Sequence, residues 1–95
     1  MADPVRDNVR DNTGEQRFEL EIQGQTAFVY YAIKPGVIRL MHTDVPLVMA
    51  GQGVASRLIK GALEQVRARG LKVEAECPFV LGYLGKHPEF SDLIA

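Results

Sequence analysis

Residues 37–76 read VIRLMHTDVPLVMAGQGVASRLIKGALEQVRARGLKVEAE, and this stretch decides the fold. It starts with an apolar strand-like segment, passes through a loop with two glycines, and ends in a second short strand-like segment. Between them, the apolar residues of positions 53–69 recur at helical spacing, and Gly70 follows the last of them as a C-terminal cap. Because a helix between two strands is a crossover connection, the two strands are expected to be parallel neighbours.

Two further strands are predicted upstream. Residues 17–22 alternate polar and apolar side chains, which indicates a strand with one wet face, and Gly24 lies in the turn that follows. Residues 26–33 are apolar on both faces, which predicts a central strand covered on both sides. Lys34-Pro35-Gly36 is a turn, and residues 79–93 are expected to form a broken helix. The predicted fold class is α/β (α+β), in the order β-β-β-α-β-α: an antiparallel meander and one parallel crossover.

The chain of 95 residues has room for one domain, predicted at residues 17–95. Residues 1–16 are predicted to be a disordered polar tail, because they hold almost no bulky apolar side chains. This segment contains a tandem repeat, Val5-Arg6-Asp7-Asn8 followed by Val9-Arg10-Asp11-Asn12. A helix that places Val5 and Val9 on one face is the alternative.

Composition excludes several classes of function. The net charge of −1 gives no electrostatic reason to bind nucleic acid or an anionic membrane. The single cysteine cannot form an intrachain disulfide. The sequence shows neither a signal peptide nor an apolar segment of the roughly 20 residues that a membrane span needs. A cytoplasmic protein is therefore predicted. No group of His, Cys, Asp and Glu has the spacing of metal ligands, so no metal is expected. The oligomeric state cannot be predicted.

The loop of residues 49–55, Met-Ala-Gly-Gln-Gly-Val-Ala, is the first candidate site. Gly51 and Gly53 allow positive φ and a close approach of the backbone to a ligand. The free N–H groups at the start of the following helix attract an anion, and a pyrophosphate would fit. The plain alternative is a glycine turn that only starts a helix. A P-loop is excluded because Lys and Ser/Thr do not follow the glycine.

Three further motifs accompany this loop: His42-Thr43-Asp44-Val45-Pro46 before it, and Cys77-Pro78-Phe79-Val80 and Lys86-His87-Pro88-Glu89-Phe90 after it. Together with the strand–loop–helix–strand order, they resemble the GCN5-related N-acetyltransferases, and in particular their very short YjdJ-type branch. The pyrophosphate loop of that family reads Gln/Arg-x-x-Gly-x-Gly/Ala, which Gly53-Val54-Ala55 matches while Ala50 departs from it. A second departure is Asp44, where a Glu is common. The resemblance covers about residues 18–95.

The resemblance implies acetyl-CoA as the cofactor and an amine as the acceptor. In this family the two parallel strands splay apart, and the pantetheine arm of the cofactor lies between them. The backbone of Thr43, Asp44 and Val45 would then bind pantetheine, and Lys86 and His87 could reach the phosphates. A solvated lysine at a helix end is the plain alternative for Lys86. The loop residues implied in pyrophosphate binding are Gly51, Gln52, Gly53, Val54 and Ala55.

The candidates for catalysis are Cys77, His42 and Tyr83, and Asp44 is weighed beside them. Cys77 stands at a strand–helix junction, where a helix dipole could favour a thiolate that accepts the acetyl group; a buried structural cysteine is the alternative. His42 could be a general base or a histidine satisfied within the sheet. Asp44 is more simply a strand-end carboxylate than a base. Tyr83 matches in position the tyrosine that protonates the departing thiolate in the family, and a core aromatic is its alternative reading.

The sequence therefore predicts a small N-acetyltransferase that transfers acetyl from acetyl-CoA to an unidentified amine, carried by a small molecule or a protein. A coenzyme A-binding or sensing module without turnover is the alternative. A structural domain that does not respond to coenzyme A is a third hypothesis.

Overall fold

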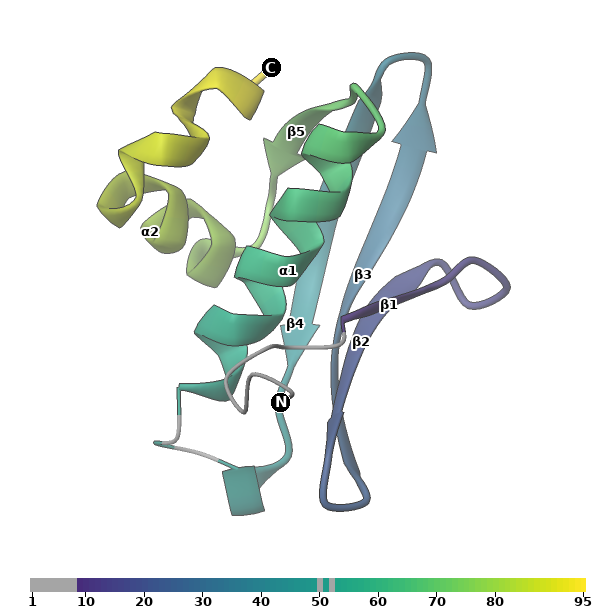
Figure 1. The fold of residues 1–95 in the computed structure, drawn as a ribbon, viewed down its shortest axis with the longest axis vertical. Helices are drawn as coiled ribbons and strands as arrows, with labels where there is room; N and C mark the ends of the chain where they lie inside the picture. The colour runs from purple at the N-terminus through teal and green to yellow at the C-terminus, as the bar shows by residue number, and fades with distance from the viewer. Residues whose placement is uncertain (1–8, 50, 52) are drawn as a thin grey trace, which may run out of the picture.

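The computed structural model describes residues 9–49, 51 and 53–95, which form one five-stranded sheet with its helices on one side (Figure 1). Four strands are antiparallel neighbours in chain order: β1 (Arg10–Asn12), β2 (Arg17–Ile22), β3 (Gln25–Lys34) and β4 (Val37–Asp44). Strand β5 (Lys72–Ala75) pairs with β4 in parallel. The helical elements are η1 (Leu47–Met49), α1 (Val54–Ala68), α2 (Pro78–Lys86) and η2 (Pro88–Leu93). The predicted order β-β-β-α-β-α is confirmed from residue 17 onward.

Local chemistry sets both hairpins of the meander. Gln23 and Gly24 have φ values of 52° and 80°, and two consecutive positive φ angles make the tight turn that matches the twist of β2 and β3. Between β3 and β4, Pro35 fixes its own φ while Gly36 adopts a φ of 76°. These two turns hold β3 at the centre of the meander, as its apolar sequence predicted.

The hydrophobic core lies between the sheet and α1. Side chains at helical spacing on α1 are buried against alternate residues of β3, and the rings of Phe18 and Tyr31 lie 5.1 Å apart beneath the helix. The buried residues of α1 are Val54, Leu58, Ile59, Ala62, Leu63 and Val66. None of the helices in the described ranges is long and apolar enough to cross a membrane.

The predicted tail boundary at Gln16 is wrong for residues 9–16. Residues 10–12 form β1, which pairs with β2, and Val9 is only 8% exposed. The sequence prediction failed because this segment is held mainly by polar partners that are distant in the chain, with Val9 as its one buried apolar residue. The rest of the predicted tail, residues 1–8, lies outside the described residues.

The prediction that β3 is covered on both faces is also wrong. Ala27, Val29 and Tyr31 are buried under α1, but no described helix packs on the opposite face, here called the open face. There Phe28 and Tyr30 are half-buried, with the Arg17 guanidinium 4.3 Å from the Phe28 ring centroid. Arg17 therefore covers part of the Phe28 and Tyr30 rings on this face, where the sequence predicts full burial.

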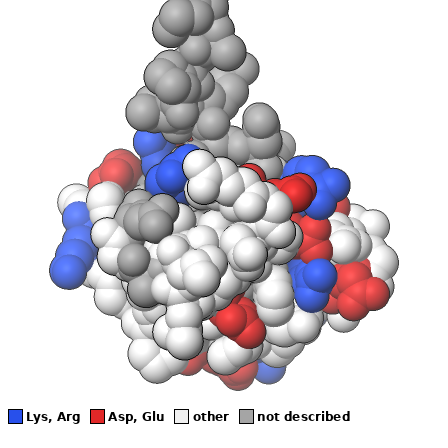
Figure 2. Space-filling model, turned by 90° about the horizontal axis from the view of Figure 1, so that it is seen from below, with Lys and Arg blue, Asp and Glu red and all other residues white. Residues whose placement is uncertain are grey.

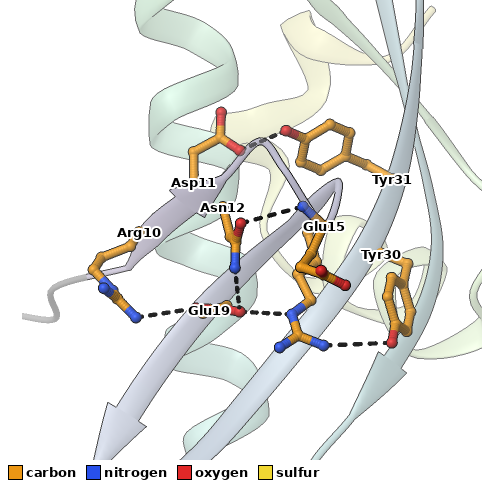
Figure 3. Close-up of polar contacts among 8 residues, drawn as sticks. Arg10, Asp11, Asn12, Glu15, Glu19, Tyr30 and Tyr31 are labelled. Carbon is orange, nitrogen blue, oxygen red and sulfur yellow. Dashed lines mark hydrogen bonds and ion pairs between the residues drawn. The ribbon is translucent and has the colours of Figure 1, made fainter.

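Glu19 lies on the open face of β2 and is 5% exposed. Its carboxylate accepts hydrogen bonds from Arg17 Nε at 2.6 Å, from Arg10 Nη2 at 3.0 Å and from Asn12 Nδ2 at 3.0 Å (Figure 3). The hydrogen bond from Arg17, followed by that from Asn12, holds the pKa of Glu19 below its ordinary value of 4.5. Glu19 therefore joins β1 to the rest of the sheet.

Stability should depend on pH through this carboxylate. Because the pKa of Glu19 is lower in the folded protein than in the unfolded chain, its contribution is complete above pH 4.5 and is lost as the pH falls through the folded pKa. We expect Glu19→Gln to cost about 1–2 kcal/mol at pH 7 and less below pH 4. Urea unfolding across this range measures the effect, with exposed Glu21→Gln on the same strand as the control. A Glu19→Gln penalty that does not shrink in acid would contradict the assignment.

Candidate functional site

The loop between η1 and α1 presents an open helix N-terminus. Gly51 and Gly53 have φ values of 79° and 70°. Apart from chain neighbours, no atom of the described residues lies within 4 Å of the position that a Cβ on either glycine would occupy. Among the described residues no side chain caps the helix, and its first turn contains no acidic residue. The N–H groups at the start of α1 are therefore available to an external anion. Of the predicted loop residues, Gln52 lies outside the described ranges, as does Ala50.

Two adjoining pockets extend from this loop. The first, of about 270 Å³, includes Gly51, Gly53 and Phe79 in its wall, and the second, of about 260 Å³, includes Lys86 and Tyr83. Ser56 and Phe79 line both pockets, so the two form one groove between the start of α1 and α2. Of the predicted site residues, Val45, Val54 and Ala55 also line this groove.

The surface around η1 carries little charge. Leu47 and Val48 of η1 are 90% and 69% exposed, and most charged side chains on this end of the molecule lie towards its margin (Figure 2). A phosphate group at this end would therefore be held chiefly by backbone N–H groups, with Lys86 as the cationic side chain of the groove.

The sheet opens between its two parallel strands. Pairing of β4 with β5 ends at Leu40 and Ala75, whereas β4 continues to Asp44. The pairing of β4 with β3 shifts register at the same point, because Met41 is an extra residue that forms a β-bulge. Strand β4 thus has an edge without a β5 partner from Met41 to Asp44, which agrees with the predicted splay.

Cys77 lies where the two strands part. It is 7% exposed, occupies the N-cap of α2, and its Sγ donates a hydrogen bond to Thr43 Oγ1 at 3.4 Å. Burial raises the pKa of Cys77, but the hydrogen bonds with Thr43 and with the backbone of Val80 and Phe79 outweigh burial, so its pKa lies below the ordinary value of 9.0. The thiol is therefore both enclosed and biased towards the thiolate.

His42 and Asp44 do not accompany Cys77. The bulge at Met41 turns both side chains to the open face, where they pair with Tyr30 and Phe28 of β3, whereas Thr43 faces the helices. The His42 and Tyr30 rings are stacked with centroids 6.5 Å apart. Two of the predicted residues, Cys77 and Thr43, are brought together, and His42 is on the other side of the sheet.

Tyr83 is 6% exposed and lies in the groove with Lys86. Burial, followed by the charges of Glu89 and Glu64, raises its pKa, so the phenol keeps its proton at neutral pH and can act as an acid. His87 stacks on the Tyr83 ring with centroids 4.0 Å apart and pairs with Glu89 through Nδ1 at 3.2 Å. His87 is thereby engaged in supporting Tyr83.

Sequence reasoning missed three contributors: the bulge at Met41 and the two residues shared by both pockets, Ser56 and Phe79. Phe79 could have been found as an exposed aromatic directly after Cys77-Pro78, and it is 40% exposed. Within the described ranges no three His, Cys, Asp or Glu side chains are grouped to hold a metal ion.

The parted parallel strands, the glycine loop and the groove define a small α+β domain with an open helix N-terminus beside an unpaired strand edge. Residues 17–93 match the family model described as GCN5-related N-acetyl-transferase, and the chain belongs to this family. Protein NATD1 of Mus musculus is 27% identical over 88 residues, which cover 90% of this chain and 78% of that protein. Protein NATD1 of Homo sapiens is 27% identical over 88 residues, covering 90% of this chain and 76% of that protein. The solution structure of a GCN5-like protein from Staphylococcus aureus is 28% identical and superposes with a TM-score of 0.70, covering 93% of this chain and 89% of the other.

Proposed function

We propose that the protein is an N-acetyltransferase that binds acetyl-CoA in this groove and transfers the acetyl group to an amine. The observation that supports the proposal most is the uncapped N-terminus of α1 behind Gly51 and Gly53, next to the unpaired edge of β4. The N–H groups of α1 would hold the pyrophosphate, and the backbone of β4 from Thr43 onward would bind the pantetheine arm. The space above both glycines supports this placement, because a Cβ there would meet no atom of the described residues beyond the chain neighbours.

Cys77 would take part in the transfer as a nucleophile. Its thiolate attacks the thioester carbonyl, a bond forms between Cys77 Sγ and the acetyl carbon, and the bond to the coenzyme sulfur breaks. Tyr83, which keeps its proton at neutral pH, would supply a proton to the departing thiolate. The amine would then attack the acetyl carbon on Cys77, and the bond between that carbon and Sγ would break. The proton that the amine loses would return to the Tyr83 phenolate, so that the Cys77 thiolate and the Tyr83 phenol are both regenerated. Thr43 supports this role because its hydroxyl contacts Sγ at 3.4 Å.

Calorimetric titration with acetyl-CoA tests the cofactor, and intact-protein mass after incubation tests the covalent step. We expect saturable binding and the added mass of one acetyl group. Binding without this mass would be consistent with direct transfer to the amine or with a cofactor-sensing module. Release of free coenzyme A thiol in the presence of a panel of amines distinguishes these two, because only a transferase releases it faster than background. No binding at millimolar acetyl-CoA would overturn the proposed function.

Cys77→Ser should lose the covalent acetyl group and slow turnover by roughly tenfold to a hundredfold, because a hydroxyl at this position does not ionise at neutral pH. Affinity for acetyl-CoA should stay within about threefold, since serine is close to cysteine in size and the glycine loop and the backbone of β4 that would hold the cofactor are unchanged. His42→Ala is the comparison variant, because His42 lies on the open face. Equal turnover in the wild type and Cys77→Ser would remove Cys77 from the reaction.

A further inference from the structure

The tandem repeat in the sequence has a structural counterpart in β1. Its second copy, Val9-Arg10-Asp11-Asn12, consists of β1 and the residue before it, and each of its four residues contacts residues elsewhere in the chain. The first copy, Val5-Arg6-Asp7-Asn8, has the same four residues in the same order and lies outside the described ranges.

Val9 and Asp11 bind to the helix side of the sheet. Val9 lies over Gly61 of α1, where a Cβ on the glycine would fall 2.4 Å from Val9 Cγ2, and Gln65 Nε2 donates to the Val9 carbonyl. The Asp11 side chain is only 7% exposed and accepts a hydrogen bond of 2.5 Å from the Tyr31 hydroxyl (Figure 3). Asp11 also forms an ion pair with Arg69 at the end of α1. A smaller residue at position 9 or a neutral one at position 11 would lose these contacts.

Arg10 and Asn12 bind to the open face. Both side chains donate to Glu19, each at 3.0 Å and to a different carboxylate oxygen, as Figure 3 shows. The edge of β2 and the adjoining surface of α1 therefore recognise all four side chains of a Val-Arg-Asp-Asn segment. We call this surface the tetrapeptide site; its partner residues are Glu19, Tyr31, Gly61, Gln65 and Arg69.

We propose that the tetrapeptide site has two alternative ligands within the chain, and that Val5-Arg6-Asp7-Asn8 replaces the second copy by a register shift of four residues. A shift by an even number keeps every side chain on its own face of the strand, whereas a shift by one would invert them. After the shift, Val5 lies over Gly61, Asp7 meets Tyr31 and Arg69, and Arg6 and Asn8 meet Glu19.

The register observed for β1 is the major one. The shift lengthens the connection to β2 from residues 13–16 to residues 9–16, and doubling a loop lowers the probability of closure about threefold. It also gives up the turn hydrogen bonds in which Glu15 N–H and Gln16 N–H donate to Asn12 and Thr13 carbonyls. Because the two copies have identical residues, the first copy would make the same contacts within the tetrapeptide site. The second register is therefore a minor state, and a substitution in the second copy should populate it.

Urea unfolding of the full chain tests this exchange through its two aspartates. Asp7→Ala should leave the unfolding equilibrium constant unchanged. Asp11→Ala should raise it only by the cost of the register shift, which is about threefold from loop closure together with the lost turn hydrogen bonds, because Asp7 takes over the contacts with Tyr31 and Arg69. Asp7→Ala/Asp11→Ala should raise it about tenfold more than Asp11→Ala alone, since no carboxylate then reaches the site. A double variant equal to Asp11→Ala, or an Asp11→Ala chain that no longer folds, would overturn the proposal. A double variant that does not fold, beside an Asp11→Ala chain that does, supports it.

Thiol labelling provides a second measurement that reads the register directly. Cys77 is the only cysteine, so Val9→Cys in a Cys77→Ser chain carries a single thiol, buried in the major register and released in the shifted one. Labelling with iodoacetamide under native conditions should slow at least about threefold when Val5→Gly and Asp7→Ala are added, because the shifted register loses its ligand. Equal labelling rates in the two chains would show that the first copy does not enter the site.

Discussion

Gly53→Asp is expected to abolish binding of acetyl-CoA, lowering affinity by about a thousandfold or more, while the fold is retained. The new carboxylate would stand at the N-cap of α1, where it would bind the first N–H groups of the helix itself and repel a pyrophosphate. The fold should persist because Gly53 has a φ of 70°, a conformation that Asp tolerates better than most residues. In addition, no described atom outside the neighbouring residues lies within 4 Å of the new Cβ. Calorimetric titration measures the loss.

Gly53→Asn is the matched control, since it has the same size, tolerates the same backbone conformation and adds no charge. We expect it to bind acetyl-CoA at least about tenfold more tightly than Gly53→Asp. Gly24→Asp in the β2–β3 hairpin adds the same charge at a φ of 80° and should leave binding unchanged. If Gly53→Asp bound as the wild type does, the assignment of this loop to phosphate would be wrong.

The crossover at residues 37–76 was predictable because its signals are local. Helical spacing on α1, Gly70 at its end and two apolar flanks specify strand–helix–strand without knowledge of any distant contact. The glycine loop was predictable for the same reason. Glycine can adopt a positive φ independently of its tertiary contacts, and Gly51 and Gly53 both have a positive φ in the structure.

The faces of β4 were not predictable. Simple alternation places Leu40 and His42 on one face, but the bulge at Met41 puts Leu40 under α1 and His42 on the open face. The bulge is decided by pairing with β3, so no pattern within β4 shows whether His42 or Thr43 shares a side with Cys77. The same holds for β1, because Asp11 depends on Tyr31 and Arg69, which are distant in the sequence.

Gly61→Ala should destabilise the protein by about 1–3 kcal/mol, although glycine to alanine within a helix ordinarily stabilises by about 0.5–1 kcal/mol. The new methyl group would fall 2.4 Å from Val9 Cγ2 and 2.7 Å from Val9 Cβ, so either Val9 or α1 must move. Urea unfolding measures the change. Gly85→Ala in α2, where no atom lies within 4 Å of the new Cβ, is the matched control and should stabilise.

The sign of the effect should reverse once no valine can occupy the space over Gly61. In a chain with glycine at both positions 5 and 9, Gly61→Ala should stabilise by about 0.5–1 kcal/mol, as it does in an unobstructed helix. Both positions are changed because the tandem repeat offers Val5 as a substitute for Val9. This cycle separates contact with β1 from the intrinsic preference of α1, since helix propensity is the same in both backgrounds. If Gly61→Ala is equally destabilising in both chains, the segment before β1 does not rest on Gly61 in solution.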